Sequence, residues 1–107
     1  MVVQIDGKRC ATLDDYLSFI YQRLNFPFLD RRPNILGYDD WMTDSAYFHN
    51  DIIHFIIINY NMFLSEDAEE KAKIMDKFVR FMLWWEHDVV ECVVGGKPKE
   101  FNVYIVD

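Results

Sequence analysis

The pattern of apolar and polar positions changes period several times along the chain, and each period predicts a different element. The opening run of residues 2–6 has strand character and ends at the turn signal Asp6-Gly7-Lys8. Behind Thr12, a favourable N-cap with acidic residues following it, apolar residues recur at helical spacing. These positions are Tyr16, Leu17, Ile20, Tyr21 and Leu24. We therefore expect a strand followed by a helix over residues 13–24.

The middle of the chain breaks this regularity and then turns strongly apolar. Residues 25–37 contain Pro27 and Pro33 together with asparagine and glycine, which predicts a loop. A short helix is expected over residues 38–44. The following run, residues 51–59, is almost continuously apolar and rich in isoleucine, a pattern typical of a strand covered on both faces of a parallel sheet.

The last third predicts a long helix and a closing strand. Ser65-Glu66-Asp67 is expected to cap a helix that reaches Trp84 and Trp85. Its second half is apolar on nearly every side except Arg80, so it is either buried all round or presents an aromatic patch to a partner, and burial is the favoured interpretation. Residues 89–94 either extend the helix or form a strand, and residues 101–106 read as the closing strand.

The order of elements predicts the fold class. Strand, helix, short helix, strand, long helix and strand in succession indicate an α/β protein, with a small three-stranded parallel sheet and right-handed crossover helices. The 107 residues fit one domain over residues 1–107, and no linker or repeat divides them.

Charge and composition restrict the partners and the location. The net charge is −7, which argues against direct binding of nucleic acid or an anionic membrane and permits a basic protein partner. No stretch is long and apolar enough for a membrane helix, and the first residues lack the features of a signal peptide, so a cytoplasmic location is expected. Cys10 and Cys92 lie far apart without metal-ligand spacing and are expected to be reduced structural thiols. A monomer is expected, or a weak dimer if Trp84 and Trp85 form an exposed patch.

The residues offer little for catalysis. There is no glycine-rich phosphate loop, no G-x-S-x-G elbow and no H-E-x-x-H motif. Of the isolated histidines His49, His54 and His87, His54 falls within the apolar strand and is expected to be structural. The alternative of a small enzyme depends on His87 and its two acidic neighbours, residues 86–88, and adjacent residues on a helix do not share a face. We expect no enzyme, no cofactor and no metal.

The segment that stands out is Tyr38-Asp39-Asp40-Trp41-Met42-Thr43-Asp44, which follows the proline-bearing loop. On a helix, Asp40 and Asp44 would share one face, as would Tyr38 and Trp41. Two interpretations are open. The segment is a surface helix with acidic residues outward and aromatic residues inward, or it is a contact site that meets a cationic pocket.

Four stretches of the chain carry a family resemblance. They are Ile5-Asp6-Gly7-Lys8 with Thr12-Leu13-Asp14-Asp15, then Leu24-Asn25-Phe26-Pro27, then residues 34–43, and finally residues 101–106. These stretches follow one another in the order found in the barstar family, and the chain therefore resembles that family. Its members inhibit secreted ribonucleases of the barnase kind inside the cell that produces them. The resemblance implies a barstar-like fold and the function of an intracellular inhibitor that blocks the cationic active site of a ribonuclease toxin.

The resemblance also implies roles for particular residues. Asp40 matches the helix aspartate that enters the ribonuclease active site, and Asn34 matches a motif asparagine with a structural role. The expected partner-binding face spans residues 28–44. Within it, Asp39 and Asp44 would add charge, while Tyr38, Trp41 and Phe28 would supply apolar contact.

The chain departs from the family pattern in three places. Leu36 replaces the first aspartate of the family's Asn-Leu-Asp-Ala motif. Residues 28–31 stand where the family has an aromatic pair and a glycine, and the family's glutamate on the last helix has no clear match in a region that holds Arg80 and Trp84. An alternative function therefore stays open. The same fold would serve as an immunity or regulatory module for a partner that is not a ribonuclease, with residues 78–94 as the contact surface.

Overall fold

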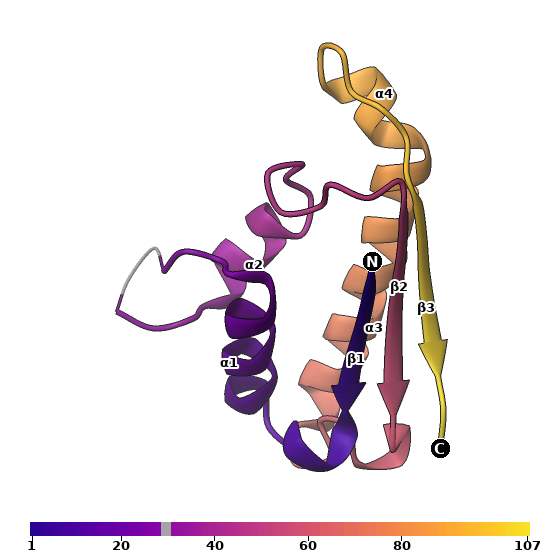
Figure 1. Cartoon of the computed structure of the whole chain (residues 1–107). Coiled ribbons are helices and arrows are strands. Elements are labelled where there is room, and N and C mark those ends of the chain that lie inside the picture. The colour runs from indigo at the N-terminus through magenta and orange to yellow at the C-terminus, as the bar shows by residue number, and fades with distance from the viewer. Residues whose placement is uncertain (29–30) are drawn as a thin grey trace.

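The protein is a small α/β domain built on a three-stranded parallel sheet, as a computed structural model of the chain shows (Figure 1). The structure describes residues 1–28 and 31–107. The strands are β1 (Val2–Asp6), β2 (Ile52–Ile58) and β3 (Glu100–Ile105), in the spatial order β1-β2-β3. The helices are α1 (Leu13–Leu24), α2 (Ile35–Trp41), α3 (Ala68–Leu83) and the short α4 (Val89–Cys92). The predicted fold class, with its parallel sheet and crossover helices, is confirmed.

Helix α1 begins and ends where local chemistry predicts. The Thr12 hydroxyl accepts a hydrogen bond from the Asp15 backbone N–H at 3.2 Å, and the Asp15 carboxylate accepts one from the Thr12 N–H at 3.4 Å. This reciprocal capping box satisfies two N–H groups that a helix start otherwise leaves unpaired. At the other end, Asn25 adopts a left-handed conformation with φ of 57°, which stops the helix.

The core lies against one face of the sheet. The parallel registers place Val3 beside Phe55 and Phe55 beside Val103, so alternate residues of neighbouring strands point to the same side. Most residues on that side are fully buried, among them Ile5, Ile53 and Phe101, and burial decreases toward the end of β3. Their side chains pack against the apolar faces of α1 and α3, which encloses one continuous core.

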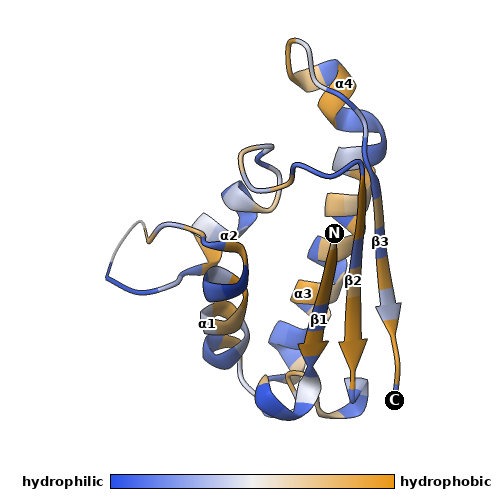
Figure 2. Cartoon of the chain, in the orientation of Figure 1, coloured by the Kyte–Doolittle hydropathy of each residue, from blue (hydrophilic) through white to orange (hydrophobic). Residues whose placement is uncertain are grey.

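The prediction that β2 is covered on both faces is wrong. The helices lie on one side of the sheet, and among the described residues no element covers the other side (Figures 1 and 2). The strand order explains this arrangement. Each connection moves one strand further in the same direction, so two right-handed crossovers bring their helices to the same face. Along β2 the burial therefore alternates, with Ile53, Phe55 and Ile57 buried and Ile52 exposed.

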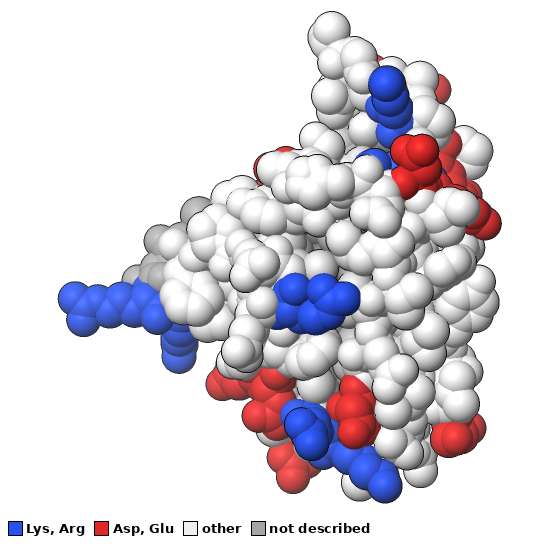
Figure 3. Space-filling view, in the orientation of Figure 1, with Lys and Arg blue, Asp and Glu red and all other residues white. Residues whose placement is uncertain are grey.

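His54 lies on this uncovered face. Its ring is half-buried, 5.5 Å from the Tyr104 ring, and its Nδ1 is 3.4 Å from the Asn102 side-chain amide. These contacts agree with the expected structural role of His54. The residue lies on the open side of the sheet and not in the core. Few charged side chains lie over the strands on this face (Figure 3).

Helix α3 continues beyond its predicted end. A π-helical turn, Trp84–Asp88, and then α4 extend it, which resolves the alternatives for residues 89–92 in favour of helix. The helix starts after Asp67, whose side chain makes no capping bond within its own helix and instead accepts from the Leu13 N–H at 3.0 Å. Asp67 is thus the N-cap residue within the predicted segment, but it makes no side-chain cap hydrogen bond, because its carboxylate joins α3 to the start of α1.

The apolar half of this helix is only partly buried. Phe78, Phe81 and Trp85 belong to the core, whereas Leu83 is 50% exposed and Trp84 is half-buried. The two adjacent tryptophans therefore differ. Trp85 points inward, and Trp84 lies at the surface between α2 and α3.

Two buried tyrosines give the fold a pH dependence. The hydroxyls of Tyr16 and Tyr38 lie 2.9 Å apart in the core, and burial raises the pKa of both above the ordinary 10.0. In the unfolded chain both phenols ionise above this value, while the folded chain retains their protons. Their contribution to stability is thus complete below about pH 10 and is lost as the pH rises further.

We expect the free energy of unfolding to fall above about pH 10, by up to about 1.4 kcal/mol per pH unit for each tyrosine. Urea unfolding at a series of alkaline pH values measures this slope. The double variant with Tyr16→Phe and Tyr38→Phe retains both rings and removes both hydroxyls, so its stability should be close to that of the parent at neutral pH. Its alkaline slope should be shallower, and an unchanged slope would contradict the assignment.

Both cysteines are free. Cys10 is buried, and burial raises the pKa of its thiol to about 11, while Cys92 is exposed on α4. Over the described parts of the chain, no helix combines the length and apolar character that crossing a bilayer requires.

Candidate protein-binding site

Helix α2 is positioned by Asn34. The Asn34 side-chain Oδ1 accepts a hydrogen bond from the Gly37 N–H at 2.7 Å, and the Asn34 backbone carbonyl accepts one from the Tyr21 hydroxyl at 2.8 Å. A side chain at Gly37 would collide with that hydroxyl, so glycine permits α1 and α2 to approach closely. The helix therefore starts at residue 35, three residues before the predicted position, because an asparagine cap determines its start.

We expect Asn34→Ala to lower the free energy of unfolding by about 1 kcal/mol, through loss of the cap. Asn34→Asp retains an acceptor and should have a smaller effect. Thermal unfolding of both variants tests this prediction. Equal losses for alanine and aspartate would indicate that the cap does not hold α2 in place.

The exposed side of α2 presents Asp40 together with Leu36. Both residues are exposed, Leu36 to 74% of its surface, and their spacing of four places them on one helix face. The Asp40 carboxylate has no hydrogen-bond or ion-pair partner among the described residues. In the sequence, Leu36 stood out only as a departure from a family motif. An apolar residue at a position where that motif has an acid was the signal that could have identified it as an exposed candidate for contact.

Asp39 lies on the other side of the helix and is held internally. Its Oδ2 is 2.9 Å from Lys77 Nζ, which joins α2 to α3. Because Lys77 compensates its charge, Asp39 adds less to an outward acidic field than its sequence position predicts. Its Oδ1 is buried and lacks a hydrogen-bond partner among the described residues.

Asp44 does not share a helix face with Asp40, so that prediction is wrong. Helix α2 ends at Trp41, and Asp44 lies in the turn beyond it. There its side chain accepts from the Ala46 N–H at 2.8 Å, the local bond that aspartate commonly makes in turns. The Asp44 carboxylate therefore stabilises a turn, and Asp44 is not on the helix that its spacing from Asp40 suggested.

The three aromatic residues of the predicted face have different environments. Tyr38 is fully buried, so its predicted role as a contact residue is wrong, because its hydroxyl and ring complete the core. Trp41 is half-buried, and its Nε1 donates to the Pro27 carbonyl at 3.1 Å, which fixes the preceding loop on α2. Phe28 is 56% exposed and lies 5.7 Å from the Tyr21 ring. Leu29 and Asp30, also within the predicted face, lie outside the described residues.

The structure thus assembles a smaller face than the sequence predicted. Asp40 and Leu36 are exposed on α2, and Phe28 is exposed on the loop before it. Asn34 and Trp41 hold the helix and the loop, and the exposed residues of the predicted face also include Arg31 and Arg32.

The residues of the enzyme alternative lie elsewhere. Glu86, His87 and Asp88 are exposed on the π-helical turn. Within residues 1–28 and 31–107, no three or more side chains of the types His, Cys, Asp and Glu are grouped so that they could hold a metal ion.

Comparisons with known proteins give no identification. No family model, no curated protein and no solved structure matches the chain. Of the expected barstar-like character, the structure shows a small α/β fold with a three-stranded parallel sheet.

Proposed function

We propose that this protein is an inhibitor that binds a basic protein, a ribonuclease toxin, and blocks its cationic active site with the exposed face of α2. The observation that carries the proposal is Asp40. Its carboxylate is exposed on a helix anchored at both ends, and no described residue compensates its charge.

The chemistry of the face supports this function. A ribonuclease active site is cationic because it holds phosphates, and a carboxylate held at a fixed position can take the place of a phosphate there. Anchoring by Asn34 and Trp41 limits the conformational entropy that the face loses on binding. Leu36 and Phe28 would exclude water around the charge pair, and the net charge of −7 would accelerate encounter with a basic partner.

Titration against a panel of small basic ribonucleases, with RNA cleavage as the readout, tests the proposal. We expect stoichiometric inhibition of a cognate enzyme that weakens as salt is added, because screening reduces attraction between exposed charges. Loss of inhibition in Asp40→Ala would assign the effect to α2. If no ribonuclease in a broad panel is inhibited, this function is excluded.

A second candidate is an immunity or regulatory module for a partner that is not a ribonuclease. The arm formed by α4 and the following turn favours it, because Val90, Val93 and Val94 are all exposed there. The aromatic residues of the same segment are mostly buried, so valines would form the contact surface. Val90→Ser and Val94→Ser would then weaken partner binding, while Asp40→Ala would leave it unchanged.

A further inference from the structure

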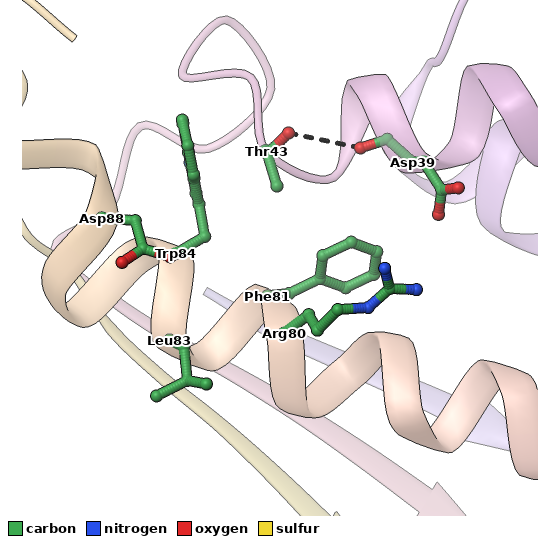
Figure 4. A pocket seen from close by; sticks show the side chains of 7 residues that line it. All are labelled: Asp39, Thr43, Arg80, Phe81, Leu83, Trp84 and Asp88. Carbon is green, nitrogen blue, oxygen red and sulfur yellow. Dashed lines mark hydrogen bonds between the residues drawn. The ribbon is translucent and has the colours of Figure 1, made fainter. Parts of the chain in front are cut away.

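A groove of about 320 Å³ lies between α2 and α3, and Asp39, Arg80, Phe81 and Trp84 are among the residues that line it (Figure 4). Two of its polar atoms, Asp39 Oδ1 and Trp84 Nε1, have no hydrogen-bond partner among the described residues. Both atoms are buried, so a ligand in the groove cannot reach them. The uncovered side of the sheet differs from the groove, because its side chains are open to contact.

This open face of the sheet is an apolar surface. Because side chains alternate along a strand, Val2, Ile52, Ile56, Ile58 and Tyr104 all point to it. Val2, Ile52 and Tyr104 are about half exposed, at 53%, 48% and 48%, and the other two are half-buried. Charged side chains lie mostly around the strands and not over them (Figure 3). A contiguous apolar surface with a charged rim is typical of a protein contact site.

The size of the open face suits a weak contact. The strands β1, β2 and β3 contain five, seven and six residues. With about 4.8 Å between strands and about 3.3 Å per residue, the face measures about 15 Å by about 20 Å. Two such faces with their rims would bury about 1,000–1,200 Å², at the lower end of the range for specific interfaces. The expected affinity of two such faces for each other is therefore micromolar.

The two edges of the open face carry opposite charges. Beside β1, the exposed Arg23 of α1 donates to the Val2 carbonyl at 2.9 Å. On β3, the exposed Glu100 lies beside Ile52 in the register, so its side chain points to the same face. Val2 pairs with His54, two residues after Ile52, so Arg23 and Glu100 lie near the same end of the sheet. Neither has an ion-pair partner among the described residues.

We propose that two copies of this chain pack their open faces together about a twofold axis parallel to the strands. Rotation about this axis lays β1 of one copy over β3 of the other and keeps the same ends of the strands together. Arg23 of each copy then lies near Glu100 of the other, and the apolar residues of β2 face each other.

The charges also distinguish this axis from its alternative. A twofold axis that runs across the strands would lay each strand over its own copy in the reverse direction. Glu100 would then lie toward Asp107 of the second copy, and the two acidic residues would repel each other. The axis along the strands avoids this repulsion and forms two pairs of opposite charge, so the contact is self-complementary.

This inference is independent of the proposed inhibitor function. Helix α2, which carries the exposed Asp40, lies on the helix-covered side of the sheet (Figure 1). A dimer formed through the open faces therefore leaves both copies of α2 accessible to a partner. The polar side chains at the centre of the contact are already near each other, with the Asn102 amide 3.4 Å from His54 Nδ1.

Sedimentation velocity of the whole chain, from about 1 μM to about 500 μM, tests the proposal. We expect a reversible monomer–dimer equilibrium with a dissociation constant of about 10–100 μM. Tyr104→Lys places a charge within the contact and should raise this constant at least about tenfold. Val79→Lys is the matched control, because Val79 is similarly exposed, at 50%, but lies on α3. It should leave the equilibrium unchanged, and circular dichroism checks that both variants are folded.

Charge exchange tests the axis. Arg23→Glu and Glu100→Arg should each weaken the dimer, because like charges would then face each other, and the double variant should restore it. A monomer at all concentrations, equal effects of Tyr104→Lys and Val79→Lys, or no restoration in the double variant would overturn the proposal. A dimer that inhibits no ribonuclease would reject the proposed function alone. Ribonuclease inhibition by a chain that stays monomeric would reject the dimer alone.

Discussion

Trp85→Ala is expected to lower the free energy of unfolding by about 3–5 kcal/mol. The Trp85 side chain is 1% exposed and packs against Phe48, with ring centroids 5.8 Å apart. Its Nε1 donates to the Met42 carbonyl at 3.0 Å, and its own carbonyl accepts from the Lys99 N–H at 2.7 Å. The alanine variant would leave a cavity and one buried carbonyl without a partner. Urea unfolding monitored by circular dichroism measures the loss.

The neighbouring tryptophan is the matched control for this prediction. Trp84 is half-buried at the groove, so Trp84→Ala should lower the free energy of unfolding by only about 1 kcal/mol. Trp85→Phe retains most of the apolar contact but loses the bond to Met42, and it should lie between the two. Equal destabilisation by the two alanine variants would show that the inward and outward assignments of the tryptophans are wrong.

Asp40→Ala is expected to raise the dissociation constant for a cognate ribonuclease by at least about thirtyfold, or about 2 kcal/mol. The reason is that the cationic groups of the partner would lose the carboxylate that pairs with them and remain buried without compensation. Most of the change should appear as faster dissociation, because the close contact is lost while the overall acidic field remains. Kinetic binding measurements at two salt concentrations determine both rates.

Asp76→Ala is the matched control, because it removes the same unit of charge from an exposed position on α3. It should change the association rate slightly and leave dissociation unchanged, since long-range steering depends on the summed charge. If Asp40→Ala changes the affinity by less than about fivefold, or 1 kcal/mol, and matches Asp76→Ala, the assignment of Asp40 as the central contact fails.

Local sequence signals were sufficient wherever a short segment determines its own structure. The Thr12 cap and the apolar spacing behind it predicted α1 over residues 13–24, as the structure has it. The alternation of strands and helices was enough to predict a parallel sheet with crossover connections. The start of α2 was misplaced because Asn34 was assigned to a loop, although an asparagine with a free side chain is also a good N-cap.

The candidate site depended more on contacts between distant residues. Asp39, Asp40 and Asp44 were expected to form one acidic cluster, but Lys77, 38 residues further along the chain, compensates Asp39. Tyr38 was expected at the surface, and its burial depends on Tyr16, which pairs with it across the core. Neither partner could be identified from the segment itself, because a hydrogen bond or ion pair between helices depends on how the helices pack.

The sequence by itself determined the elements, their order and the acidic character of the chain, because periodicity, caps and net charge are properties of local segments or of the whole composition. Only the tertiary structure decided which faces remain open. The strand order β1-β2-β3 with two right-handed crossovers leaves one side of the sheet uncovered, although β2 is apolar on both sides. Packing of α2 against α3 likewise separated the exposed Asp40 from the compensated Asp39 and formed the groove beside Arg80 and Trp84.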